Sequence, residues 1–160
     1  TEGSPIQSLI HGLKYDGMPR LGRALGQMIS SLLPAQTDLL VPVPLHRTRE
    51  AERGFNQAAT IAAGIAHVTG RPISRATKRV RATHTQTTLS IRSRDENLRG
   101  AFAPSRTALT EMQGKHLLLI DDVMTTGATL LSLAATLTEA TRPRSISILT
   151  LAVAEATVAK

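Results

Sequence analysis

The feature that most constrains the fold is the aliphatic run Leu117–Ile120, which two carboxylates, Asp121 and Asp122, follow directly. A continuous apolar run this short is typical of a strand that is covered on both faces. Two further segments are predicted to be strands, and helical patterns lie between them: strands at 39–41 and 145–153, and helices at 55–68 and 126–140. Strands that alternate with helices predict an α/β fold with a mostly parallel sheet flanked by helices.

Helices are also expected before the first strand. Apolar residues at helical spacing lead to Leu13, and a second helix is predicted from Pro19 to Pro34, so residues 1–35 form an N-terminal helical part. A chain of 160 residues has the length of one domain, which is expected to span 1–160. Two weaker strands are predicted at 72–80 and 101–103, and the polar, basic segment 81–99 is predicted to be a mobile loop.

The charge is strongly positive and unevenly distributed. The formal net charge is +7, and nine Lys and Arg lie between Arg71 and Arg106 against the acids Asp95 and Glu96. This pattern favours a polyanionic partner, either nucleic acid or a phosphorylated small molecule, although a solvated face would have the same composition. The five histidines show no metal-ligand spacing, and the absence of cysteine excludes disulfides and thiolate zinc sites in this chain.

The sequence gives no reason to expect a membrane protein. No apolar run approaches the roughly 20 residues that a bilayer requires, and no signal-peptide core is recognisable. We therefore expect a cytoplasmic protein that does not insert into a membrane.

The residues after Ile120 combine features that favour a ribose phosphate. Ligands of parallel sheets bind at the carboxyl ends of strands, and a helix start offers backbone N–H groups to an anion. Three threonines add hydroxyl donors, Gly127 permits close approach of a ligand, and the two carboxylates can accept hydrogen bonds from sugar hydroxyls. The alternative is an ordinary N-capped helix with acids near its positive end. A P-loop and a dinucleotide-binding glycine fingerprint are both absent.

The run "LLLIDDVMTTGAT" resembles the phosphoribosyl-pyrophosphate (PRPP) signature of type I phosphoribosyltransferases. Three further segments resemble the ComF-like branch of that family, which is associated with competence and DNA uptake: "LIHGLKYDG" at 9–17, "VPVPLHRTREAERGFNQA" at 41–58 and "KRVRATHTQTTLSIRSRDENLRGAF" at 78–102. Together the four segments cover most of the chain in the order of the family. The resemblance implies the type I phosphoribosyltransferase fold.

The resemblance also implies roles for individual residues. Asp121 and Asp122 would be the catalytic pair that holds the ribose hydroxyls, and the remaining PRPP-binding residues would be Met124, Thr125, Thr126, Gly127, Ala128 and Thr129. The loop that approaches the pyrophosphate would contain Leu45, His46, Arg47 and Arg49, and the mobile loop would contribute Arg79, Arg81, Thr83 and Gln86. Magnesium would arrive with PRPP, so no direct metal ligand is expected in the protein. For the motif 53–57 the role is open, although Asn56 could simply cap the next helix.

Two departures from the family limit these expectations. Transferases of 6-oxopurines place Asp where Thr125 stands, and because Thr is no general base near neutral pH, hypoxanthine and guanine are disfavoured as acceptors. ComF-like proteins usually carry a Cys-rich zinc module before the segment at 9–17, whereas this sequence has no cysteine.

The sequence therefore leaves two alternative functions open. The first is transfer of ribose 5-phosphate from PRPP to an unknown nitrogen acceptor, with loss of pyrophosphate. The second is a non-catalytic DNA- or protein-binding component of DNA uptake that retains the PRPP site as a sensor or vestige. An acidic protein partner and a homodimer are left open.

Overall fold

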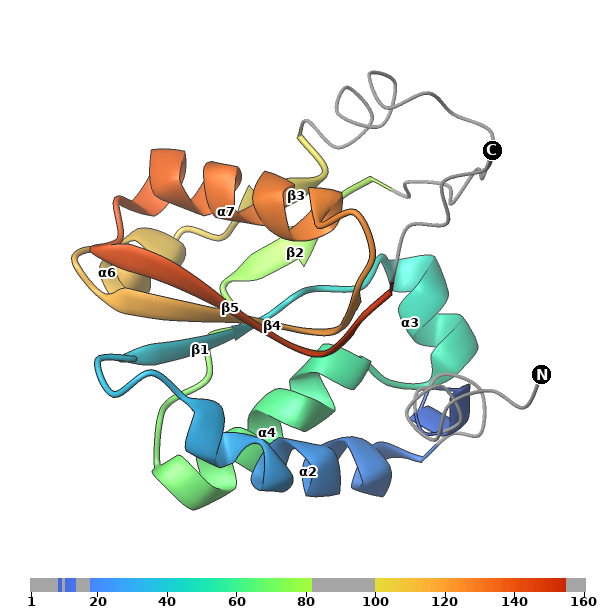
Figure 1. Ribbon diagram of the computed structural model, residues 1–160. Helices are drawn as coiled ribbons and strands as arrows, with labels where there is room; N and C mark the ends of the chain where they lie inside the picture. Colours follow the sequence, from blue (N-terminus) through green and yellow to red (C-terminus); the bar gives the residue numbers. More distant parts are fainter. Residues whose placement is uncertain (1–8, 10, 14–17, 82–99, 155–160) are drawn as a thin grey trace, which may run out of the picture.

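The computed structural model describes residues 9, 11–13, 18–81 and 100–154 (Figure 1). The elements are α2 (Pro19–Met28), the 3-10 helix η1 (Ser30–Leu32), β1 (Leu39–Pro42), α3 (Arg47–Arg53), α4 (Gln57–Thr69), β2 (Thr77–Arg79), β3 (Phe102–Pro104), α6 (Ala108–Met112), β4 (His116–Met124), α7 (Ala128–Thr141) and β5 (Ser145–Val153). Residues 9 and 11–13 are helical, and the remainder of the predicted first helix lies outside the described residues.

The main sheet has the strand order β1-β4-β5, and both neighbouring pairs are parallel. An isolated parallel bridge from Leu40 to Ile73 continues the sheet beyond β1. Strands β2 and β3 form a separate antiparallel pair. The structure thus confirms the predicted α/β class and its mostly parallel sheet.

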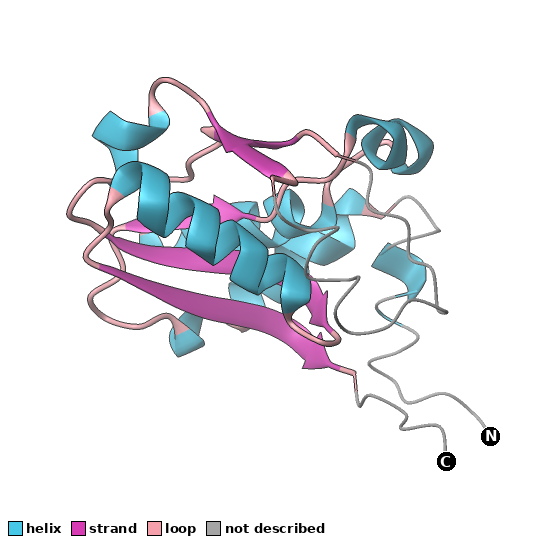
Figure 2. Cartoon of the chain, turned by 90° about the horizontal axis from the view of Figure 1, so that it is seen from above, coloured by secondary structure: helices cyan, strands magenta, loops and turns pink. Residues whose placement is uncertain are grey.

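The sheet lies between two helical layers (Figures 1 and 2). Strand β4 alternates its side chains between them: Leu117 and Leu119 join the core cluster under α7, whereas Leu118 and Ile120 join the cluster over α4. All four are almost completely buried, as the aliphatic run predicted. Full burial of such a side chain is worth roughly 1.5–3 kcal/mol, so this strand contributes strongly to the stability of both cores.

Helices α2 and α4 touch through glycines. A Cβ atom on Gly26 would collide with the carbonyl oxygen of Ile61, and a Cβ on Gly64 would collide with that of Arg23. The two helix backbones are therefore closer than any larger residue would permit, which fixes the lower helical layer against β1 and β4.

Several predicted boundaries differ from the observed ones. The second helix ends at Met28, and a 3-10 turn completes the path toward Pro34. The segment 72–80 is a strand only at 77–79, because the buried Ser74 hydroxyl accepts a hydrogen bond from the Ala76 amide 3.1 Å away and turns the backbone. Helices α3 and α6 were not expected. Neither segment shows a long apolar stripe, and no residue of α3 is buried.

In the described part of the chain, every helix is too short or too polar to traverse a lipid bilayer.

Candidate functional site

Strand β4 continues beyond its neighbour β1. The last paired residue of β1, Pro42, lies opposite Ile120, and the Val43 amide donates a hydrogen bond to the Ile120 carbonyl at 2.8 Å. On its other side β4 stays paired with β5 as far as Met124. The acid pair predicted to follow the strand therefore lies within it, where β1 no longer runs alongside.

The backbone fixes the orientation of both carboxylates. Asp121 Oδ1 accepts a hydrogen bond from the Asp122 amide at 2.9 Å, and Asp122 Oδ1 accepts one from the Val123 amide at 2.8 Å. Asp122 is only 9% exposed, whereas Asp121 is half-buried. Successive residues of a strand point to opposite faces, so a ligand that meets both carboxylates must lie over the edge of β4 that β1 leaves uncovered.

A tight turn connects this strand end to α7. Gly127 has φ +74°, a left-handed conformation that glycine adopts without steric cost, and it stands at the N-terminal cap position of α7. Thr125 and Thr126 are exposed, and Thr126 Oγ1 accepts a hydrogen bond from the Ala128 amide at 3.4 Å. Hydroxyl groups and helix-start amides thus gather beside the acid pair, as the motif predicted.

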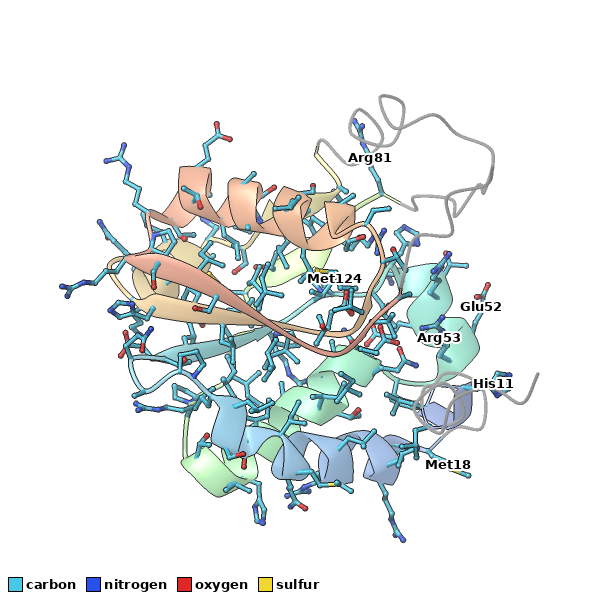
Figure 3. The ribbon with its side chains drawn as sticks, viewed as in Figure 1. His11, Met18, Glu52, Arg53, Arg81 and Met124 are labelled. Atoms are coloured by element: carbon cyan, nitrogen blue, oxygen red, sulfur yellow. The ribbon has the colours of Figure 1, made fainter. Side chains whose placement is uncertain are left out.

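Met124 plays a different part from its neighbours. Its side chain packs against the apolar core, and its carbonyl accepts a hydrogen bond from the Ala154 amide at 2.8 Å. Figure 3 shows Met124 between β4 and α7. Met124 therefore anchors the turn to the core, and both its side chain and its carbonyl already contact other parts of the protein.

The predicted pyrophosphate loop is partly a helix. His46 caps α3, its Nδ1 accepting a hydrogen bond from the Thr48 amide at 3.4 Å, and Arg47 and Arg49 lie on α3 itself. Leu45 and His46 are half-buried at the carboxyl end of β1, and Arg47 is exposed. The segment follows β1 to the same edge of the sheet as the acid pair, where the expectation placed it.

Arg79 lies in β2, within the strand predicted at 72–80, and pairs with Phe102 of β3, whereas the family resemblance assigns it to the mobile loop. It is also bridged to His46 in parallel, and its guanidinium lies 5.6 Å from the Phe102 ring centroid. Burial lowers the pKa of Arg79, the cation of Arg49 lowers it further, and the carboxylate of Asp121 opposes both. Arginine pKa values are so high that the side chain remains charged.

This arrangement places two cations and a carboxylate at one edge of the sheet. Arg49 comes from α3, Arg79 from β2 and Asp121 from β4, three segments that are distant in the sequence. Mutual repulsion between the two guanidinium groups would be relieved by an anion bound between them. The neighbouring Arg81 is exposed at the end of the described segment (Figure 3), whereas Thr83 and Gln86 lie outside the described residues.

The motif 53–57 connects the start of α4 to the end of β1 and to the N-terminal helical residues through hydrogen bonds. Asn56 caps α4 by accepting from the Ala59 amide at 3.3 Å, and its Nδ2 donates to the Val43 carbonyl at 3.0 Å. Gln57 donates to the Leu13 carbonyl at 3.4 Å and accepts from Arg53 at 3.1 Å. The capping of α4 was anticipated, but the tie to the end of β1 was not, because sequence spacing does not reveal a partner 13 residues away.

The described residues contain no group of three His, Cys, Asp or Glu side chains that could hold a metal ion. Two carboxylates without a third protein ligand suit a Mg²⁺ ion that retains water and is shared with phosphate oxygens.

Comparison with known proteins agrees with this geometry. A model of the phosphoribosyl transferase domain matches residues 21–159. The DNA utilization protein YhgH of Salmonella typhi is 38% identical over 140 residues, covering 81% of this chain and 60% of that protein. Competence protein F of Haemophilus influenzae is 35% identical over 138 residues, covering 79% and 58%, and competence protein ComFC of Bacillus subtilis is 35% identical over 124 residues, covering 76% and 47%.

Solved structures share the fold at lower identity. A structure described as the allosteric regulatory enzyme of purine biosynthesis aligns with a TM-score of 0.56 at 21% identity, over 81% of this chain and 25% of that one. The glutamine PRPP amidotransferase of B. subtilis gives a TM-score of 0.55 at 21% identity with the same coverage. The chain spans about 60% of the length of the first curated relatives. On the family match, supported by the fold and the competence-protein relatives, the chain belongs to the phosphoribosyl transferase domain family.

Proposed function

We propose that the chain binds PRPP and transfers its ribose 5-phosphate to a nitrogen acceptor, with release of pyrophosphate, in the context of DNA uptake. The observation that carries this proposal is the convergence of an acid pair, a hydroxyl-rich helix start and two arginines at one edge of the sheet. A cytoplasmic location is part of the same proposal.

Each part of PRPP has a suitable partner in this arrangement. Asp121 and Asp122 would accept hydrogen bonds from the ribose hydroxyls, since ionised carboxylates only accept. The turn from Thr125 to Thr129 would bind the 5-phosphate through hydroxyl groups and the amides at the start of α7. Arg49 and Arg79 would bind the pyrophosphate, whose charge would offset their mutual repulsion.

Asp121 and Asp122 suit Mg²⁺ as an ion that the substrate carries, because in the described part of the chain no third His, Cys, Asp or Glu joins them to complete a metal site. When bound, the ion would neutralise phosphate charge and make pyrophosphate a better leaving group.

The chain's own residues would act mainly through position and charge. A bond forms between the acceptor nitrogen and ribose C1 while the bond from C1 to the pyrophosphate oxygen breaks. The electron pair leaves with pyrophosphate, and the proton of the acceptor nitrogen passes to water or to the released pyrophosphate. Arg49 and Arg79 would stabilise that growing negative charge, and the backbone-oriented carboxylates would hold the sugar in place for attack. We expect no 6-oxopurine acceptor, because Thr125 stands where a carboxylate base would be needed.

Turnover is tested by following pyrophosphate release from PRPP and Mg²⁺ with a panel of nucleobases and amines. Release that depends on one acceptor and is lost in Asp121→Asn with Asp122→Asn would support the transferase. PRPP binding without release, for every acceptor offered, would instead favour a sensor that retains only the site. Absence of both binding and release, in a folded chain, would overturn the proposal.

A second candidate function is binding of nucleic acid without catalysis. The net charge of +7 and relatives named for DNA utilization and competence favour it. Salt-sensitive binding of an oligonucleotide is its simplest test, because such binding depends on releasing counterions.

A further inference from the structure

Three cations gather at the end of the sheet opposite the candidate site. Lys115 precedes β4, and Arg142 and Arg144 lie in the connection from α7 to β5. The two connections are tied together: the Gly114 amide donates to the Arg142 carbonyl at 3.1 Å, and the Arg144 amide donates to the Lys115 carbonyl at 2.8 Å. We name Lys115, Arg142 and Arg144 the basic end cluster.

The basic end cluster has no counter-ion among the described residues. None of its three side chains forms an ion pair or side-chain hydrogen bond there, and the same holds for the nearby carboxylate of Glu139. The other nearby acid, Asp38, accepts a hydrogen bond from the His116 amide at 2.9 Å. Arg142 and Arg144 are exposed, so their guanidinium groups can meet an external anion.

Arg142 stands where the backbone favours a different residue. Its φ of +47° and ψ of +58° are left-handed, and among the described residues it is the only non-glycine with positive φ. Glycine is the usual residue at this position after a helix. An arginine at a position where glycine would be less strained suggests that the Arg142 side chain has a function.

From these observations we propose that the basic end cluster binds the sugar-phosphate backbone of nucleic acid. Arginine is well suited to phosphate because its guanidinium can donate two parallel hydrogen bonds. Nucleic acid is favoured over a protein because protein interfaces centre on apolar or aromatic anchors. No exposed large hydrophobic side chain of the described chain belongs to residues 113–116 or 142–145.

The basic end cluster is separate from the candidate PRPP site. Figure 1 shows the connection from α7 to β5 on the left, whereas the turn before α7 is on the right. Nine residues of β4 separate Lys115 from the turn, a length of about 30 Å at roughly 3.3 Å per residue. Nucleic acid bound at the basic end cluster would therefore leave the PRPP site accessible, and each site can be removed without the other.

The test measures binding of a fluorescent mixed-sequence oligonucleotide, single-stranded and duplex, across a salt series. Variants Arg142→Gly and Arg144→Gln are compared with Arg20→Gln and Arg23→Gln, two exposed arginines on α2. Each cluster substitution is expected to weaken binding about three- to tenfold and to lower the salt slope by about 1, whereas the α2 substitutions leave both nearly unchanged. Arg142→Gly relieves the disfavoured backbone, so misfolding would not explain its loss of binding.

Three results would overturn the proposal. The first is an unsubstituted chain that fails to bind the oligonucleotide at low salt, and the second is cluster variants that bind like the α2 controls. The third is tighter binding of polyglutamate than of the oligonucleotide at equal salt, which would assign the cluster to an acidic protein. PRPP binding by the same variants is measured in parallel, and it is expected to be unaffected, so this proposal can fail without the proposed function failing.

Discussion

The two ends of the parallel sheet differ in how their charges are arranged. At the carboxyl end, Arg79 is half-buried beside the cation of Arg49 and the carboxylate of Asp121, so it belongs to a site built from several elements. At the amino end, Arg142 and Arg144 are exposed without an ion pair among the described residues. This difference fits the two proposals, a positioned site for a small anion at one end and an open surface for an extended anion at the other.

The largest expected effect comes from neutralising the acid pair. Asp121→Asn with Asp122→Asn should weaken PRPP binding about 100-fold or more, because two charge-assisted hydrogen bonds to the ribose are lost. The amide oxygens can still accept from the Asp122 and Val123 amides, so the fold should persist. Calorimetry gives the affinity and circular dichroism checks the fold. An unchanged affinity would remove the ribose assignment.

Replacing Arg79, which lies beside Arg49 and Asp121, should weaken PRPP binding much more than it lowers the stability of the fold. Arg79→Met is expected to weaken PRPP about 10- to 100-fold through loss of a charge-assisted contact. Stability should change little, because the loss of the ring contact with Phe102 is offset by removal of a partly buried cation beside Arg49. Thermal unfolding and PRPP titration are compared, with Arg106→Met, an exposed arginine, as the control. A large fall in Tm with unchanged affinity would make Arg79 structural.

The central strand and the ligand-binding end of the sheet could be predicted from the sequence, because both depend on patterns of neighbouring residues. The run 117–120 identified the central strand, and the residues 121–129 identified the end at which ligands are expected. The structure corrected what depends on long-range contacts. Arg79 falls where the strand predicted at 72–80 overlaps the mobile loop that the resemblance implies, and only its pairing with Phe102 shows that it belongs to the strand. Helix α3 lacks buried residues, so it left no periodic signal.

The basic end cluster shows the same limit. Lys115 lies 27 residues before Arg142, and only the hydrogen bonds between their connections bring the cations together. The densest positive charge in the sequence lies in the stretch 71–106, with nine of the 19 Lys and Arg, and this stretch contains none of the three. The role of Asn56 as a cap could be anticipated from the adjacent helix pattern, whereas its bond to the Val43 carbonyl could not.

Gly64 lies in α4, away from the charged residues at both ends of the sheet, so its substitution should change stability without changing ligand binding. Gly64→Ala should destabilise the fold by about 2–3 kcal/mol, because the added methyl group collides with the Arg23 carbonyl, although alanine by itself favours a helix by about 1 kcal/mol. Urea unfolding measures the change, and Ala63→Gly in the same helix is the control for propensity. A Gly64→Ala chain as stable as the parent would contradict the close packing of α2 on α4.

Substitution of Asn56, which connects α4 to the end of β1, should have a smaller effect on stability. Asn56→Ala removes the cap of α4 and the bond to Val43, at a cost of about 1–2 kcal/mol. Asn56→Asp retains the capping oxygen but loses the donor, so its stability should lie between those of the parent and the alanine variant. If Asn56→Asp unfolds at the same denaturant concentration as the parent, the tie to Val43 contributes nothing measurable.

The smallest expected effect is at the amino end. Arg142→Gly should leave stability unchanged or raise it by less than about 1 kcal/mol, because relief of the left-handed backbone is partly cancelled by the greater freedom of glycine when unfolded. Arg144→Gly, at a residue without positive φ, is the control and should be destabilising. Thermal unfolding distinguishes the two, and a loss of stability in Arg142→Gly would show that its side chain supports the fold.

The most direct test of the carboxyl-end site is calorimetric titration of the unsubstituted chain with PRPP and Mg²⁺, beside separate titrations with ribose 5-phosphate and with pyrophosphate. The proposed site requires contacts to ribose, 5-phosphate and pyrophosphate together, so PRPP should bind at least about tenfold more tightly than either fragment. Equal affinity for PRPP and pyrophosphate, or no binding of PRPP by the folded chain, would contradict it.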